Sequence, residues 1–260
     1  MRILVTNDDG IRAPGVQALA RKMAELGEVV LAAPSEEKSA IGHGITIRDT
    51  IRLRKIKIEG VEQAWGVTGT PADCVKLGLA ELLENKCDLV ISGINSGPNL
   101  GTDVLYSGTV SAAIEGVILG VPSLAVSLNS WDSDDYTVSV EIVHQLVKFF
   151  LDKKLTLPHG TIFNVNIPAV KREDILGYKV TILGERQYEN RFEKRLDPRG
   201  NPYYWSVGRL LPFQEVDCEY DVVAVEKNYV SITPIQFDLT NYRIMQEVNE
   251  WGLEKLSVLF

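Results

Sequence analysis

Short apolar runs bounded by turn-forming residues recur along the chain. Runs of this kind without strict alternation are typical of strands buried on both faces in a parallel sheet. Segments between them carry apolar residues at the three- and four-residue spacing of a helix with one buried face. The runs are Ile3–Val5, Val29–Ala33, Leu89–Ile91, Ser123–Leu128 and Ile162–Ile167, and the helical spacing occurs in 16–23, 75–83, 110–117 and 142–150. This alternation predicts an α/β fold, Rossmann-like, with three α/β/α layers and a mostly parallel sheet.

Two segments break the alternation. Residues Thr46–Ile58 alternate apolar and basic side chains, which predicts a strand or a hairpin. A longer segment, 179–215, is centred on the turn signal Asp197-Pro198-Arg199-Gly200 and carries the aromatic run Tyr203-Tyr204-Trp205. We expect a long β-hairpin that projects from the core. Because an isolated two-stranded hairpin is marginally stable in water, its exposed aromatic residues predict packing against a second subunit.

The end of the chain predicts a return to the sheet at Val230–Ile235 and a C-terminal helix over about 239–256. No linker-like composition divides the sequence. We therefore expect a single domain over 1–260, with a core formed by about 1–178 and 216–238 and with 179–215 as the projecting hairpin.

Composition narrows the functional classes. The net charge of −8 argues against stable nucleic-acid binding, which needs a basic footprint. Apolar stretches stay well below the length of about 18 residues that a membrane span requires. Cys74, Cys87 and Cys218 are widely spaced and form no zinc motif, which suits a reducing cytoplasm. We expect a cytoplasmic protein without a membrane partner.

Oxygen-bearing side chains directly follow two of the predicted strands. Asp8 and Asp9 come after the first run and Asn95 comes after the third. In open α/β sheets, ligands bind outside the carboxyl ends of the strands. Two adjacent carboxylates repel each other unless a cation lies between them. The pattern indicates a site for a hard cation; the alternative is a turn in which an aspartate caps the following helix.

Two further segments carry candidate chemistry. The tripeptide Ser107-Gly108-Thr109 precedes a helix, where unpaired N–H groups and the helix dipole can hold a phosphate. The alternative is a simple helix cap. Ser39 lies in a loop after the second strand and can offer a hydroxyl oxygen, although an exposed loop serine has the same signature. His43, in that loop, is the histidine placed where a general acid could help.

Together these residues resemble a known family. The match rests on motifs spread over the whole chain: Asn7-Asp8-Asp9-Gly10 with Pro14-Gly15, Ser39, Gly69-Thr70-Pro71-Ala72-Asp73-Cys74-Val75, Ser92 through Gly101, Tyr106-Ser107-Gly108-Thr109-Val110, and Asp197-Pro198-Arg199-Gly200. These segments are similar to those of the SurE family, the stationary-phase survival nucleotidases. The loop Glu36-Glu37-Lys38 departs from the arginine- or asparagine-containing versions of many members.

The resemblance implies a metal-dependent phosphatase that acts on nucleoside monophosphates. Its metal ligands fall on Asp8, Asp9, Ser39 and Asn95, and its phosphate-binding segment falls on Ser107, Gly108 and Thr109, with Asn95 also facing the substrate. It further implies a homodimer or homotetramer built through the hairpin and the C-terminal helix. An all-oxygen ligand set favours one Mg²⁺ or Mn²⁺ per subunit, and Ca²⁺ can also occupy such a set.

The expected reaction is hydrolysis of nucleoside 5′- and 3′-monophosphates to nucleoside and phosphate by a metal-activated water. Asp8 and Asp9 are the expected catalytic residues, with Asp9 accepting the proton of the water. Two alternatives remain at this point: a phosphatase with a covalent aspartyl-phosphate intermediate, and a module that senses nucleotides without turnover.

Overall fold

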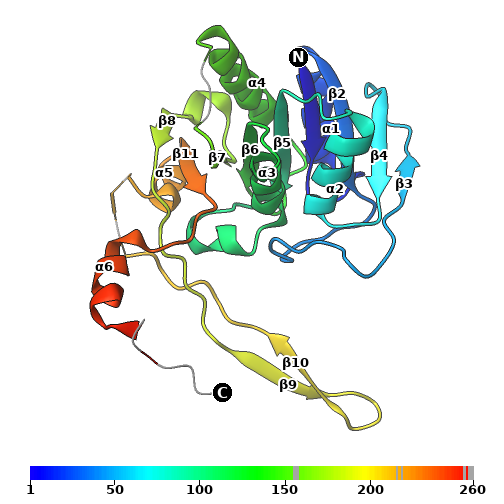
Figure 1. The fold of residues 1–260 in the computed structure, drawn as a ribbon. Helices are drawn as coiled ribbons and strands as arrows, with labels where there is room; N and C mark the ends of the chain where they lie inside the picture. Colours follow the sequence, from blue (N-terminus) through cyan, green and yellow to red (C-terminus); the bar gives the residue numbers. More distant parts are fainter. Residues whose placement is uncertain (155–157, 215, 218, 254–255, 257–260) are drawn as a thin grey trace.

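The computed structural model describes residues 1–154, 158–214, 216–217, 219–253 and 256 (Figure 1). The strands in these residues are β1 (Arg2–Thr6), β2 (Glu28–Pro34), β3 (Leu53–Lys55), β4 (Gln63–Val67), β5 (Leu89–Ser96), β6 (Ser123–Asn129), β7 (Thr161–Pro168), β8 (Gly177–Val180), β9 (Phe192–Leu196), β10 (Pro202–Ser206) and β11 (Tyr229–Gln236). The α-helices are α1 (Pro14–Met23), α2 (Pro71–Leu77), α3 (Gly108–Ile118), α4 (Thr137–Asp152), α5 (Asp221–Glu226) and α6 (Tyr242–Glu250). A π-helical turn, Gly78–Leu82, extends α2, and 3₁₀ turns occupy Gly101–Leu105 and Arg172–Asp174.

In the described residues, nine strands form one sheet in the order β3-β4-β2-β1-β5-β6-β7-β11-β8. The strands from β4 to β7 in this order are parallel. β3 pairs antiparallel with β4, and β11 pairs antiparallel with β7. From β1 the chain builds outward through β2 to β4 and then returns to the other side of β1 at β5. The strand order therefore reverses between β1 and β5, the position where open α/β sheets bind ligands.

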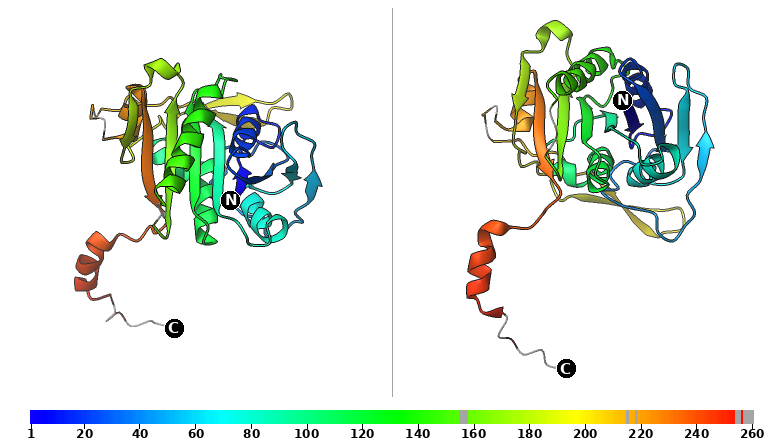
Figure 2. Two further views of the ribbon diagram at one scale, coloured as in Figure 1. Left: turned by 90° about the horizontal axis from the view of Figure 1, so that it is seen from above. Right: turned by 45° about the horizontal axis from the view of Figure 1, so that its top comes forward.

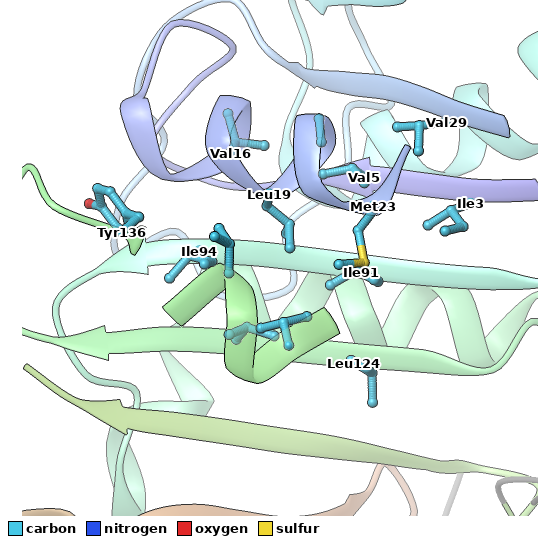
Figure 3. Close-up of a cluster of buried hydrophobic side chains, with 14 of the residues drawn as sticks. Ile3, Val5, Val16, Leu19, Met23, Val29, Ile91, Ile94, Leu124 and Tyr136 are labelled. Carbon is cyan, nitrogen blue, oxygen red and sulfur yellow. The ribbon is translucent and has the colours of Figure 1, made fainter. Parts of the chain in front are cut away.

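Helices cover both faces of the sheet (Figure 2). On one face, α1 and α4 pack over the central strands, and Val16, Leu19 and Met23 of α1 point toward Ile91 and Ile94 of β5 (Figure 3). On the other face, apolar residues of α2 and α3 pack against β1, β2 and β5. Burial of these two apolar layers stabilises the sheet and holds the ends of its strands in place. None of the helices in the described ranges combines the length and the apolar character that crossing a membrane requires.

The predicted fold class is confirmed, whereas several details differ from the sequence expectation. Within Thr46–Ile58, only β3 is a strand, and its partner β4 was not predicted. The first residues of the predicted hairpin belong instead to β8, which joins the main sheet beside β11. α5 was also not predicted. β4 was missed because glycine and a half-buried tryptophan interrupt its apolar run.

The hairpin projects from the core (Figure 1). β9 and β10 pair antiparallel around the predicted turn, where Asp197 Oδ1 accepts the N–H groups of Arg199 and Asn201, each at 2.8 Å. The predicted C-terminal helix is described as α6; Glu254 and Lys255, within that prediction, lie outside the described residues. No residue of α6 is buried. Both elements thus present apolar side chains outside the core.

The base of the hairpin is anchored by a buried carboxylate. Asp221, which is fully buried, accepts the N–H groups of Gly101, Gly184 and Val222, each at 2.8 Å. Nearby, Arg186 Nη1 lies 2.7 Å from Asp103 Oδ2, and the Tyr188 hydroxyl donates to the same oxygen at 3.0 Å. These contacts bind the segment that leads into the hairpin to the segment that precedes α3.

We predict that Asp221→Ala lowers the free energy of unfolding by about 3 kcal/mol or more, because it leaves buried backbone N–H groups without an acceptor. Chemical denaturation measures the change. Glu226→Ala is the matched control, since Glu226 is an exposed acid in the same helix, and we expect its effect to stay within about 0.5 kcal/mol. Equal stability of Asp221→Ala and the wild type would contradict the anchoring role.

Candidate active site

Asp8, Asp9 and Asn95 meet at the switch point of the sheet. Thr6, the last residue of β1, pairs with Ser92 of β5, so the end of β1 lies beside the part of β5 that leads to Asn95. Beyond Ser92, the pairing of β5 with β6 shifts register before Asn95. Gly93 lies at φ +142°, and a Cβ there would come within 2.3 Å of the Val126 carbonyl oxygen. This irregularity changes the direction of the strand end that carries Asn95.

The carboxylate of Asp8 lies against the first turn of α3. Thr109, which is fully buried, donates its hydroxyl to Asp8 Oδ1. A Cβ on Gly108 would lie only 2.8 Å from the Asp8 Cβ and 2.9 Å from Oδ2, so this approach requires glycine. The first N–H groups of a helix lack intrahelical partners and carry the positive end of its dipole. The helix end predicted to bind phosphate therefore holds the Asp8 carboxylate.

Burial makes ionisation of both carboxyl groups unfavourable. It raises the pKa of Asp8 above its ordinary value, although hydrogen bonds from Thr109 and Gly108 oppose the shift. Burial and the negative charge of Asp8 together raise the pKa of Asp9 to about 7, and the charge of Glu37 adds to this effect. The site thus concentrates negative charge that a cation would relieve.

Backbone and amide contacts orient the remaining groups on β5. Asp9 Oδ2 accepts the N–H of Ser96 at 3.0 Å. The side chain of Asn95 donates from Nδ2 to the Gly97 carbonyl oxygen at 2.7 Å, which leaves the Asn95 carbonyl oxygen as the end that can serve as a ligand. Asp8, Asp9 and Asn95 are therefore brought to one edge.

The loop that carries Ser39 is attached to this edge, although Ser39 itself is exposed. The Lys38 N–H donates to the Asp8 carbonyl oxygen at 2.8 Å, and the Gly42 N–H donates to the Tyr106 carbonyl oxygen at 3.0 Å. The Ser39 hydroxyl donates to the Glu37 carboxylate at 2.6 Å. The residue before Ser39 thus contacts Asp8, whereas the side chain of Ser39 itself is directed to Glu37.

The side chains of Ser107 and Thr109 already have intramolecular partners. Ser107 Oγ accepts the N–H of Val110 at 3.1 Å and so caps α3, as the structural alternative predicted. Its hydroxyl proton is still available for donation. The hydroxyl proton of Thr109 is directed to Asp8. Of these two hydroxyls, that of Ser107 is the one suited to meet a substrate oxygen.

His43 pairs with Glu115 of α3. Its Nε2 lies 2.8 Å from Oε2 of Glu115, and Lys76 Nζ lies 3.3 Å from the other oxygen of that carboxylate. Glu115 follows Thr109 by six residues, about 9 Å along α3. The hydrogen bond from His43 and the charge of Lys76 lower the pKa of Glu115. This contact attaches the Ser39 loop to α3 and gives His43 a structural role.

The donor set fits a hard cation held by few protein ligands. Among the described residues, no group of three or more His, Cys, Asp and Glu side chains is arranged to hold a metal ion. The available donors are the carboxylates of Asp8 and Asp9 and the neutral oxygens of Ser39 and Asn95. Mg²⁺ is commonly bound by one or two carboxylates with retained waters, whereas zinc sites use nitrogen and sulfur.

Two contributors to the site were missed in the sequence. Ser96 supplies a backbone N–H to Asp9, and Glu37 adds negative charge next to it. The proximity of Glu37 to Ser39 in the chain was a usable signal, because both lie in one loop. The N–H group that Ser96 donates belongs to the backbone, which every residue except proline shares, so the residue type could not reveal this contact.

Comparisons with known proteins identify relatives of this chain. The family model described as survival protein SurE matches residues 3–190. A protein of Heliobacterium modesticaldum named 5′-nucleotidase SurE is 52% identical over 96% of this chain and 92% of its own length. A Syntrophomonas wolfei protein of the same name is 50% identical over 95% of this chain and 93% of its length. The crystal structure of the SurE protein from Aquifex aeolicus superposes with a TM-score of 0.85 at 42% identity, covering 97% of this chain and 100% of that one.

We predict that Thr109→Val, which keeps the shape of the side chain and removes its hydroxyl, destabilises the protein by about 1.5–3 kcal/mol through loss of a hydrogen bond to a buried carboxylate. Urea unfolding measures the effect. Thr109→Ser retains the donor and should lose distinctly less stability. The role of the hydroxyl would be refuted if the serine variant were as unstable as the valine variant.

Proposed function

This chain belongs to the SurE family, and we propose that it hydrolyses nucleoside 5′- and 3′-monophosphates to nucleosides and phosphate with the aid of one divalent cation per subunit. The names of its relatives support the 5′-nucleotidase class. Cation dependence and action at the 3′ position go beyond those names. The oxygen-only donor set of Asp8, Asp9, Ser39 and Asn95 supports the first, and action at the 3′ position is proposed from the resemblance to the family alone.

The convergence of Asp8, Asp9 and Asn95 beside the start of α3 carries the proposal. Clustered carboxylates would repel a phosphate anion, so a site that binds phosphate alone gains nothing from them. With a cation between them and the phosphate, the same carboxylates become useful. This argument favours hydrolysis over a module that only senses nucleotides.

The residues proposed to hold the cation are Asp8, Asp9, Ser39 and Asn95. When bound, Mg²⁺ or Mn²⁺ would lower the pKa of water and neutralise charge on the phosphoryl group. Ser39 would turn its hydroxyl oxygen away from Glu37 to join the other three. Ca²⁺ can occupy the same oxygen ligands.

The chain supplies the remaining functions itself. Asp8 is enclosed and directed by Thr109, which suits a fixed ligand. Asp9 is only half-buried, so it is the carboxylate able to take up the proton of an attacking water. Ser107 can donate its hydroxyl proton to a phosphate oxygen, and the N-terminus of α3 favours negative charge nearby. Gly108 keeps Asp8 and the helix end close together.

We predict that Asp9→Asn lowers kcat for phosphate release from AMP by about 10²–10⁴-fold, the usual contribution of a general base. EDTA should abolish release by the wild type, and Mg²⁺ or Mn²⁺ should restore it. Asp88→Asn is the matched control, since Asp88 accepts the Arg2 N–H at 2.7 Å at the opposite ends of the same strands.

Three outcomes would change the assignment. Near-full, metal-stimulated activity of Asp9→Asn would remove Asp9 from the mechanism. Undiminished turnover of the wild type in EDTA would exclude the cation. A phosphorylated aspartate detected by mass spectrometry after rapid quenching would replace direct hydrolysis with a covalent intermediate.

We also propose that the protein forms homodimers or homotetramers through the hairpin and the C-terminal helix. Phe192, Tyr204 and Trp205 of the hairpin and Tyr242 and Met245 of α6 are exposed. Paired aromatic residues outside the core indicate an interaction surface. Neither the hairpin nor α6 buries its apolar side chains against the core of its own subunit. A partner subunit that covers both elements would bury these side chains and stabilise them.

Replacing both Tyr204 and Trp205 by glutamate should convert the assembly to monomers, because two charges would be buried in an apolar interface. Light scattering coupled to size-exclusion chromatography measures the mass. Lys194→Glu is the control, since Lys194 pairs with Tyr204 in the hairpin and changes the charge without removing an aromatic ring. A monomeric wild type would refute this proposal.

A further inference from the structure

We propose that Trp131 is the surface on which the nucleobase of the substrate stacks, and that it makes the enzyme prefer nucleotides to phosphate esters without an aromatic ring. This inference rests on the proposed function and refines it. It assigns the part of the substrate that the cation-binding residues do not contact.

The indole ring of Trp131 is placed by Gly97. Trp131 follows β6, the neighbour of β5 in the sheet. A Cβ added to Gly97 would lie 2.3–2.5 Å from three ring carbons, so the ring lies directly over the glycine. Gly97 also has φ +102°, a conformation that other residues rarely adopt. Glycine at position 97 therefore allows the indole ring of Trp131 to pack against the backbone at the end of β5.

The same strand end positions the reacting groups. Ser96 donates its N–H to Asp9, and its hydroxyl donates to the Trp131 carbonyl oxygen at 3.4 Å. Asn95 and Gly97 are two residues apart, a distance of at most about 7 Å along the backbone. A nucleoside monophosphate carries its base and its phosphate at opposite ends of one ribose. A phosphate at Asp9 and Asn95 would therefore leave the base within reach of Trp131.

The exposure and charge of the segment suit a neutral aromatic ligand. Trp131 is 72% exposed although it contacts Gly97, so much of the indole is open to a ligand. Asp132, Asp134 and Asp135 follow it in the chain. Their negative charges disfavour a phosphate at this end of the site but do not penalise a neutral base. The single phosphate of the substrate is thereby directed toward the cation ligands.

Stacking on an aromatic side chain strengthens nucleotide binding without selecting one base, since every base has a flat π face. Loss of such a contact typically weakens binding about 5- to 150-fold. Phe149, an exposed aromatic residue near the C-terminal end of α4, provides a comparison.

The test measures kcat and KM for AMP and for ribose 5-phosphate with the metal-loaded, full-length protein. Trp131→Ala should raise KM for AMP about 5- to 150-fold and leave KM for ribose 5-phosphate unchanged, with kcat little altered. Trp131→Phe, which retains a ring, should recover most of the affinity. Phe149→Ala is the matched control, since Phe149 is an exposed aromatic residue of α4 outside the proposed site and the proposed interface, and it should change the KM of neither substrate.

Equal losses on both substrates, or an unchanged KM for AMP, would overturn the role of Trp131 while leaving the proposed hydrolysis intact. If the wild type released no phosphate from any nucleotide, the proposed function would fail separately. Calorimetric titration with AMP would then decide the inference: weaker binding by Trp131→Ala than by Trp131→Phe supports it, and equal binding rejects it.

Discussion

The contact between the Asp8 carboxylate and the first turn of α3 is the constraint on which the rest of the site depends. A carboxylate buried in this way needs hydrogen bonds and a favourable dipole, and both come from the helix end. The contact requires glycine at 108 and a buried hydroxyl at 109. Burial and the neighbouring negative charge of Asp8 together raise the pKa of Asp9. Two neighbouring buried carboxylates of this kind are unfavourable by themselves, and the proposed cation would relieve their repulsion.

Three sets of contacts fix the position of the residues at this edge of the sheet. β1 and β5 bring the carboxylates and Asn95 together because they are adjacent parallel strands at the point where the sheet reverses direction. The Ser39 loop is attached through Lys38 and through the contact between His43 and Glu115. Asp221 and the Arg186–Asp103 pair attach the base of the hairpin to the segment that precedes α3. An oligomer interface formed by the hairpin would therefore be linked, through these contacts, to the segment that leads into α3.

The proposed substrate would contact two kinds of surface at this edge of the sheet. In the proposed complex, the oxygen ligands and the positive end of α3 would face the phosphate, and the exposed indole of Trp131, which lies over Gly97, would face the base. Binding energy from the base can hold the phosphate in position, which is how remote contacts contribute to the chemical step.

The sequence by itself determined the alternation of strands and helices, and hence that Asp8, Asp9 and Asn95 would share one sheet edge. That follows from local periodicity, because apolar runs report strands and the carboxyl ends of parallel strands lie together. Only the tertiary structure decided that Thr109 serves Asp8, that His43 pairs with Glu115, that Trp131 lies on Gly97, and that β4 joins the sheet. Thr109 and Asp8 are 101 residues apart in the sequence, and contacts between such distant residues depend on how the helices pack against the sheet. The spacing of residues in the sequence indicates which side chains share a face of one helix or strand. It does not indicate which residues of different elements come into contact.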